Sequence, residues 1–151
     1  RHTLMKNKSF AGLLLPRILI FIVLAINLQC ALAYIFNPLP YTAPFELSGV
    51  PGRAAVVGMG ILFVMWQVPY IFALIHPLRN FRSLIEALLM QAIGLVGEAM
   101  LRRSIPLEHG SLRSAILRFI IFDVAGLFLL ILAGALAYRL LKNSTGGYHA
   151  D

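Results

Sequence analysis

Four polar side chains lie inside long apolar runs of this sequence: Asp123, Asn27, Gln91 and Gln67. An ionisable residue at the centre of a membrane span costs about 2.5–3.5 kcal/mol, so it needs a partner or a purpose. With a rise of about 1.5 Å per helical residue, Asp123, Asn27 and Gln91 reach comparable depths, and Gln67 lies somewhat deeper. The sequence therefore predicts a polar cluster in the interior of a helical membrane protein.

Three kinds of chemistry fit this predicted cluster. The amides could donate hydrogen bonds to Asp123 and hold the helices together, at about 0.6 kcal/mol per bond. The cluster could instead form a pocket for a lipid headgroup or a quinone-like ligand, with Trp66, Tyr70 and Tyr34 as flat walls. Asp123 could also be a protonatable relay. The sequence leaves all three interpretations open.

Two further glutamates lie near the ends of the third apolar run. Glu98 and Arg118 fall near the same membrane surface on consecutive helices, which predicts an ion pair. Glu86 lies close in height to Arg17 and four residues after Arg82, so either arginine could neutralise it. These pairs are expected to hold helix ends together.

No pattern in the sequence names a reaction. His76 precedes a proline at the edge of an apolar run, which favours a solvated helix end over a metal ligand. There is no spacing typical of a nucleophile with its base, a phosphate-binding glycine loop or a metal site. We expect no catalytic residue and no resident cofactor, while a quinone, a lipid or a pigment would suit the interior.

The composition is that of a membrane protein. Of 151 residues, 60% are hydrophobic and 13% charged, and the mean hydropathy is +0.84, against about 45–50% and about 25% in soluble domains. Four stretches are long enough to span a bilayer, which predicts one all-α domain over 1–151. The predicted spans are 13–36, 54–76, 84–101 and 115–138, with a non-helical outer loop at 37–53 and a tail at 139–151.

The charges suggest an orientation. The formal net charge of +7 comes from basic residues placed between apolar runs, which indicates membrane topology and not nucleic-acid binding. Of the 13 Lys and Arg residues, eight would lie on the side of the N-terminus and five on the other. Short connections predict antiparallel neighbours. We therefore expect an up-down-up-down four-helix bundle in a bacterial inner membrane, with both termini cytoplasmic.

Small and polar residues mark the expected buried face of each helix, because helices in lipid associate through close packing and polar contacts. Pro69 should kink the second helix near Trp66. The expected stripes are Asn27, Cys30 and Tyr34; Gly60, Phe63, Gln67, Tyr70 and Leu74; Ala87, Gln91, Gly94 and Glu98; and Asp123, Gly126, Leu130, Ala133 and Ala137.

The layout resembles the DoxX-like group of small four-helix bacterial membrane proteins. The similar features are the proline-rich loop ending in Phe45-Glu46-Leu47-Ser48-Gly49, the glycine-containing segment 58–63 and the segment 91–98. The family's usual lysine after the first helix is missing, as is its glutamate followed by paired glycines in the second. The resemblance therefore implies a four-helix membrane fold and a redox role, but it transfers no catalytic residue.

Three functions follow from these observations. The first is an accessory or structural subunit of a larger respiratory or photosynthetic membrane complex, which the small size and the lack of a reaction motif favour. The second is a membrane protein with an intramembrane pocket for a quinone or lipid. The third is a proton-coupled transporter that acts as a dimer. The expected partners are membrane lipids and other membrane subunits or a second copy, with no nucleic acid.

Overall fold

The computed structural model describes residues 2–145, with side chains for 12–143, and this part of the chain is helical without a strand. Short turns join the helices. In chain order the elements are α1 (His2–Phe36), α2 (Leu39–Thr42), the 3-10 helix η1 (Ala43–Phe45), α3 (Gly49–Trp66), α4 (Val68–Ile75), α5 (Phe81–Ser104) and α6 (Gly110–Thr145).

Four helical stretches are long and apolar enough to cross a membrane: Gly12–Phe36, Gly49–Ile75, Phe81–Ser104 and Gly110–Asn143. The prediction of an all-α chain with four such segments is confirmed for the described residues, and each predicted span coincides with one of them, the second running one residue past its end at Ile75. Hydropathy marks only the most apolar part of a helix, whereas backbone hydrogen bonding continues into polar sequence. The helices are therefore longer than the predicted spans.

Helices extend into two segments that the prediction placed outside the spans. The loop at 37–53 contains α2 and η1, and α3 begins at Gly49 inside it. Pro40 and Pro51 lie in the first turns of α2 and α3, where a missing N–H costs nothing, so they start helices here and do not break them. The predicted tail is helical from 139 to 145, and its remainder lies outside the described residues.

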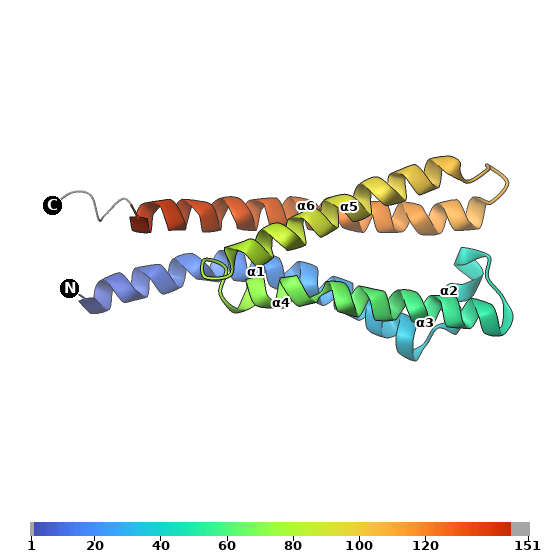
Figure 1. Cartoon of the computed structure of the whole chain (residues 1–151), viewed down its shortest axis with the longest axis horizontal. Helices are drawn as coiled ribbons and strands as arrows, with labels where there is room; N and C mark the ends of the chain where they lie inside the picture. The colour runs from blue at the N-terminus through green and yellow to red at the C-terminus, as the bar shows by residue number, and fades with distance from the viewer. Residues whose placement is uncertain (1, 146–151) are drawn as a thin grey trace.

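The long helices run side by side along the long axis of the molecule (Figure 1). The start of α1 and the end of α6 lie at one end, and α2, η1 and the α5–α6 turn lie at the opposite end. Helix α1 packs against α3, α4 and α6, while α5 packs against α4 and α6. Two helix pairs result, α1 with α3 and α5 with α6. Helix α4 contacts both α1 and α5, and so links the two pairs in the half of the molecule near the termini.

That half contains the closed core. Alanines with no exposed surface at 73, 87, 133 and 137 let the backbones of α4, α5 and α6 approach closely. Larger apolar side chains of α1, including the fully buried Ile20, fill the remaining space. Tyr70 is the last large buried residue of this core toward the other half. The core therefore seals one end of the space between the helix pairs.

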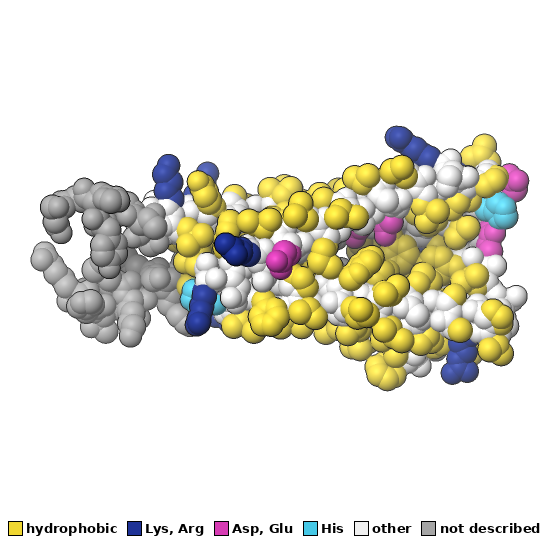
Figure 2. Space-filling view, viewed as in Figure 1, with side chains coloured by type: hydrophobic (Ala, Val, Ile, Leu, Met, Phe, Trp, Pro, Cys, Tyr) yellow, Lys and Arg dark blue, Asp and Glu magenta, His cyan; other side chains and the backbone are white. Residues whose placement is uncertain are grey.

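In the other half the two pairs separate. Gly60 of α3 lies so close to α1 that a Cβ atom there would be 2.8 Å from the carbonyl oxygen of Ala31. This contact draws α3 to α1 and away from α5. Figure 2 shows the surface hollowed in this half, with acidic side chains inside the hollow and apolar side chains around it. The fold thus leaves a cavity between the pairs.

The break between α3 and α4 falls at Gln67, beside the Trp66 position predicted from Pro69. Pro69 has no N–H to donate, and the Gln67 N–H bonds to the carbonyl of Val64 in a tightened turn. The carbonyl of Phe63 is then left free, and the Gln67 side-chain Nε2 donates to it at 2.9 Å. The break therefore fixes the Gln67 side chain in the wall of the cavity.

Candidate functional site

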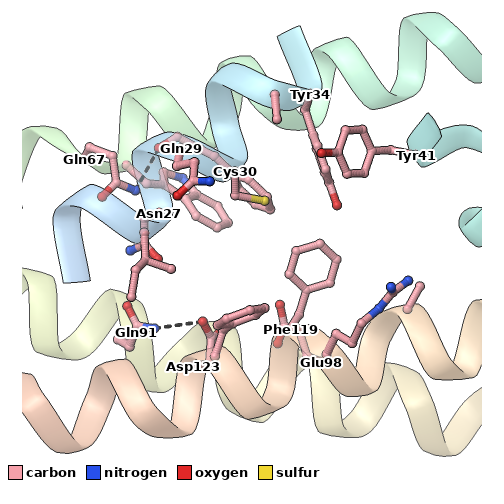
Figure 3. Close-up of a pocket in the computed structure, with 18 of the residues that line it drawn as sticks. Asn27, Gln29, Cys30, Tyr34, Tyr41, Gln67, Gln91, Glu98, Phe119 and Asp123 are labelled. Atoms are coloured by element: carbon pink, nitrogen blue, oxygen red, sulfur yellow. Dashed lines mark hydrogen bonds between the residues drawn. The ribbon is translucent and has the colours of Figure 1, made fainter. Parts of the chain in front are cut away.

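The candidate site is a cavity of about 530 Å³ between the helix pairs. Its walls come from α1, α3, α4, α5 and α6, and Pro40, Tyr41, Pro44 and Phe45 of the α2–η1 segment close its outer end. Figure 3 shows side chains of α1 and α3 facing those of α5 and α6 across the open space. All seven residues predicted for a polar interior line it: Asn27, Gln67, Gln91, Asp123, Trp66, Tyr70 and Tyr34.

A chain of hydrogen bonds crosses the inner end of the cavity. The Tyr70 hydroxyl donates to Oε1 of Gln91 at 2.6 Å, and Nε2 of Gln91 donates to Oδ1 of Asp123 at 2.8 Å (Figure 3 shows the second bond). The chain ties α4, α5 and α6 together. Gln91 is ten residues after the start of α5, about 15 Å along it. Asn27 lines the same cavity without a hydrogen bond to either residue.

Two glycines make room for this chain. A Cβ atom at Gly94 would be 2.7 Å from Oδ2 of Asp123, and one at Gly126 would be 2.8 Å from Nε2 of Gln91. Each glycine lies on the helix facing the polar side chain that it accommodates. The carboxylate and the amide can therefore meet only because the opposing backbone carries no side chain at these two positions.

Glu98 belongs to the cavity and not to the predicted surface ion pair. It lines the cavity beside Asp123, with which its carboxyl group interacts, and its Oε2 atom is buried without a hydrogen-bond partner. Arg118 also lines the cavity but forms no salt bridge with Glu98. Glu98 lies on the buried face that the sequence predicts for its helix, but its neighbour across the α5–α6 pair is Asp123.

The second predicted ion pair is also not formed. The guanidinium Nε of Arg17 donates to the carbonyl oxygen of Leu74 at 3.0 Å, where α4 nears its end. Glu86 is exposed on α5, and neither Arg17 nor Arg82 forms a salt bridge with it. An unpaired helix-end carbonyl at α4 accepts a charged donor well. Arg17 therefore binds the end of α4, and not Glu86 as the sequence predicted.

An aromatic cluster forms the outer part of the cavity wall, and Tyr34 of α1 lies at its centre. The Tyr34 ring centroid is 4.6 Å from that of Tyr41, 6.0 Å from Phe63 and 6.3 Å from Phe119. Phe119 in turn stacks on Phe45 at 5.9 Å. Phe119 precedes Asp123 by four residues, a spacing that puts both on one helix face. That spacing was the signal in the sequence that could have added Phe119 to the site.

A polar contact fastens the outer end of the cavity. Glu46, at the end of η1, contacts Nδ1 of His109 at 2.5 Å, and its other oxygen accepts a 3.3 Å hydrogen bond from the N–H of Leu112 in the first turn of α6. The pair forms a salt bridge when His109 is protonated. It links the α2–η1 segment to the start of α6, a contact that joins two loops 63 residues apart in sequence and that nothing in the sequence pattern predicted.

This contact is sensitive to pH. The hydrogen bond to His109 lowers the pKa of Glu46 below 4.5, and the same bond, with a smaller contribution from Glu108, raises the pKa of His109 above 6.5. Both groups are charged between these values. The attraction is lost when the pH rises through the raised pKa of His109, and also when it falls through the lowered pKa of Glu46. The contact is therefore complete between about pH 4.5 and 6.5.

The other histidine considered from the sequence lies away from the cavity. His76 follows the end of α4, and its Nδ1 atom accepts a hydrogen bond from the backbone N–H of Arg79 at 3.1 Å. It acts as the cap of a turn. Within the described residues, no three His, Cys, Asp or Glu side chains gather as metal ligands would.

Comparison of the chain with protein-family models, with curated proteins and with solved structures gave no match. The cavity and its lining residues are therefore the basis on which a function can be assigned.

Proposed function

We propose that this chain is a multi-pass protein of a bacterial inner membrane that binds a small molecule with a polar head and an apolar body, of the lipid or quinone type. In this proposal the four spans run up-down-up-down and both termini are cytoplasmic, as the distribution of basic residues favours. The apolar side chains exposed along all four spans would then face acyl chains.

The observation that carries the binding function is the cavity itself. Its volume of about 530 Å³ falls within the range of about 300–1,000 Å³ that is usual for small-molecule sites. Its wall combines a few converging polar groups at the inner end with aromatic rings at the outer end. A pocket of this kind is not needed for packing, since in lipid a four-helix bundle gains most from close contact along its whole length.

The position of the hollow suggests how a ligand would reach it. Helix α3 packs against α1, and α5 packs against α4 and α6, so the two walls formed by α3 and α5 flank the hollow on the side of the bundle (Figure 2). That side would face the bilayer in the proposed topology. A molecule dissolved in the membrane would then reach the polar chain of Tyr70, Gln91 and Asp123 without passing through water.

The resemblance to DoxX-like proteins supports the same kind of function, since a redox role in that group would suit a pocket for a quinone. The side chains of this cavity supply hydrogen bonds and aromatic contacts for binding, and we assign no catalytic step to them.

The test is the content of the purified protein. The chain and its Gln91→Leu and Asp123→Asn variants are purified in a mild detergent, and bound lipids and quinones are extracted and counted by mass spectrometry. We expect a stoichiometric molecule in the parent and a clear loss in both variants. Glu86→Gln, on the same helix but exposed outside the cavity, is the matched control and should retain it.

Equal ligand content in the parent and in both cavity variants would overturn the proposal, and so would a parent with no bound molecule. The same preparation tests the accessory-subunit hypothesis, because a second protein present at stoichiometric amounts would support it and a chain that migrates alone would contradict it. Proton-coupled transport by a dimer would be contradicted by transport that ignores both a pH gradient and Asp123→Asn.

A further inference from the structure

We infer that the ligand of this cavity carries a protonated amine, that is, an ammonium group with N–H donors on an apolar body. The inference rests on the proposed binding function and adds the charge of the ligand to it. The free hydrogen-bonding atoms of the cavity, its charges and its aromatic rings all point to this class.

Two buried polar atoms of the cavity lack a hydrogen-bond partner, and one of them is an amide oxygen, which can only accept. Gln67 is 4% exposed, its Nε2 atom is used by the carbonyl of Phe63, and its Oε1 atom has no partner. The second such atom is Oε2 of Glu98. A buried acceptor without a donor is unfavourable, so a ligand that supplies an N–H or O–H donor to it is stabilised in the cavity. A quinone, whose carbonyl oxygens only accept, would leave the Oε1 atom of Gln67 unsatisfied.

The hydrogen-bond chain at the inner end already engages two donors. The hydroxyl hydrogen of Tyr70 goes to Gln91, and an N–H of the Gln91 side chain goes to Asp123. A ligand with acceptor oxygens would compete with this chain for those two donors. A ligand with N–H groups leaves the chain intact and can still approach Asp123.

The charges of the wall favour a cation. Two carboxyl groups, Glu98 and Asp123, lie together in the wall, and no Lys, Arg or His side chain among the described residues forms a salt bridge with either. The one basic residue of the lining, Arg118, is exposed. Two neighbouring carboxylates out of water are costly unless a proton or a positively charged ligand neutralises them. An ammonium group between them would do so.

The aromatic cluster suits the same ligand. The rings of Tyr34, Phe63 and Phe119 line the same cavity as the two carboxyl groups and pack on one another, with centroids about 6 Å apart. Ring faces attract a cation within about 6 Å of the centroid, and the effect grows when water is excluded. The rings would also hold the apolar body. Acceptors, carboxylates and rings therefore select one class of ligand from the same cavity.

The experiment compares two probes that share an apolar body and differ in the head group: para-hexylbenzylamine, which is a cation at neutral pH, and the uncharged para-hexylbenzyl alcohol. Trp66, the single tryptophan of the sequence, lines the cavity, so its fluorescence reports occupancy. We expect the amine to bind the detergent-solubilised parent at least about tenfold more tightly than the alcohol, as for other desolvated charge pairs. Glu98→Gln should abolish this preference, while Glu86→Gln should leave it unchanged.

The probe pair tests the inference on the parent protein even where a variant fails to fold. If both probes bind equally, the charge assignment is overturned while the pocket stands. If neither probe binds, and no lipid or quinone is retained, the binding function itself is wrong.

Two natural sources could supply the ammonium group, and the retained molecule distinguishes them. Phosphatidylethanolamine in the extract identifies a lipid headgroup, and a free lipophilic amine identifies a soluble cation; both support the inference. A retained quinone or phosphatidylglycerol would overturn it.

Discussion

Replacing Gly60 by alanine should push α1 and α3 apart, because the added Cβ atom would collide with α1. Its Cβ atom would lie 2.8 Å from the carbonyl oxygen of Ala31, 2.8 Å from Cγ1 of Ile35 and 2.9 Å from Cβ of Tyr34. Ordinary contact begins at 3.4 Å, so the helices must separate by about 0.6 Å. Backbone atoms and a Cβ atom cannot move aside as the end of a long side chain can.

The size of the effect follows from two opposing contributions. Overpacking of this kind costs about 1–3 kcal/mol. Alanine gains about 0.8–1.0 kcal/mol over glycine within a helix. Gly58→Ala provides the matched control on the same helix, because a Cβ atom at Gly58 meets nothing within 4 Å. The propensity gain is common to both variants, so the difference between their free energies of unfolding should be about 1–3 kcal/mol.

The free energies of unfolding are measured by reversible titration of each purified variant from mild detergent into dodecyl sulfate, followed by circular dichroism. We expect Gly58→Ala to be slightly more stable than the parent and Gly60→Ala to be clearly less stable than Gly58→Ala. Equal stabilities for the two variants would refute the close approach of α1 and α3, and with it the separation of the helix pairs that forms the cavity.

The contact between Glu46 and His109 should control access to Cys30, which lines the cavity. Near pH 6 Cys30 should react with a maleimide more slowly in the parent than in Glu46→Gln. The ratio of the two rates should approach one as the pH rises above the raised pKa of His109. A ratio that does not change with pH would contradict the contact. Gly94→Ala should displace Asp123 from Gln91 and weaken binding of the amine probe about tenfold. Gly97→Ala, where a Cβ atom meets nothing within 4 Å, should bind like the parent, and equal binding by both variants would show that the position of Asp123 is unimportant.

The helices and their buried faces could be predicted because both depend on local sequence. Apolar runs give the spans, and small or polar residues at helical spacing give the seams: Gly60, Gln91 and Leu130 are buried as predicted. The break in the second span also followed from one residue, since Pro69 removes a backbone donor wherever it lies in a helix.

The ion pairs could not be predicted, because two residues at the same depth on different helices need not be near each other. Glu98 and Arg118 reach similar heights, yet the packing of α5 on α6 turns Glu98 toward Asp123. The contact between Glu46 and His109 needed the path of the α2–η1 segment, which a hydropathy pattern does not contain.

The sequence by itself determined that this chain has four apolar helices with a few polar groups on their inner faces, because the cost of exposing such groups to lipid acts on each helix separately. Only the tertiary structure decided that these groups border a cavity. That outcome depends on where neighbouring backbones approach: alanines close one half of the bundle, and Gly60 holds α3 on α1 in the other half. Approach distances between helices are a property of pairs of surfaces, and they exist only once the chain has folded.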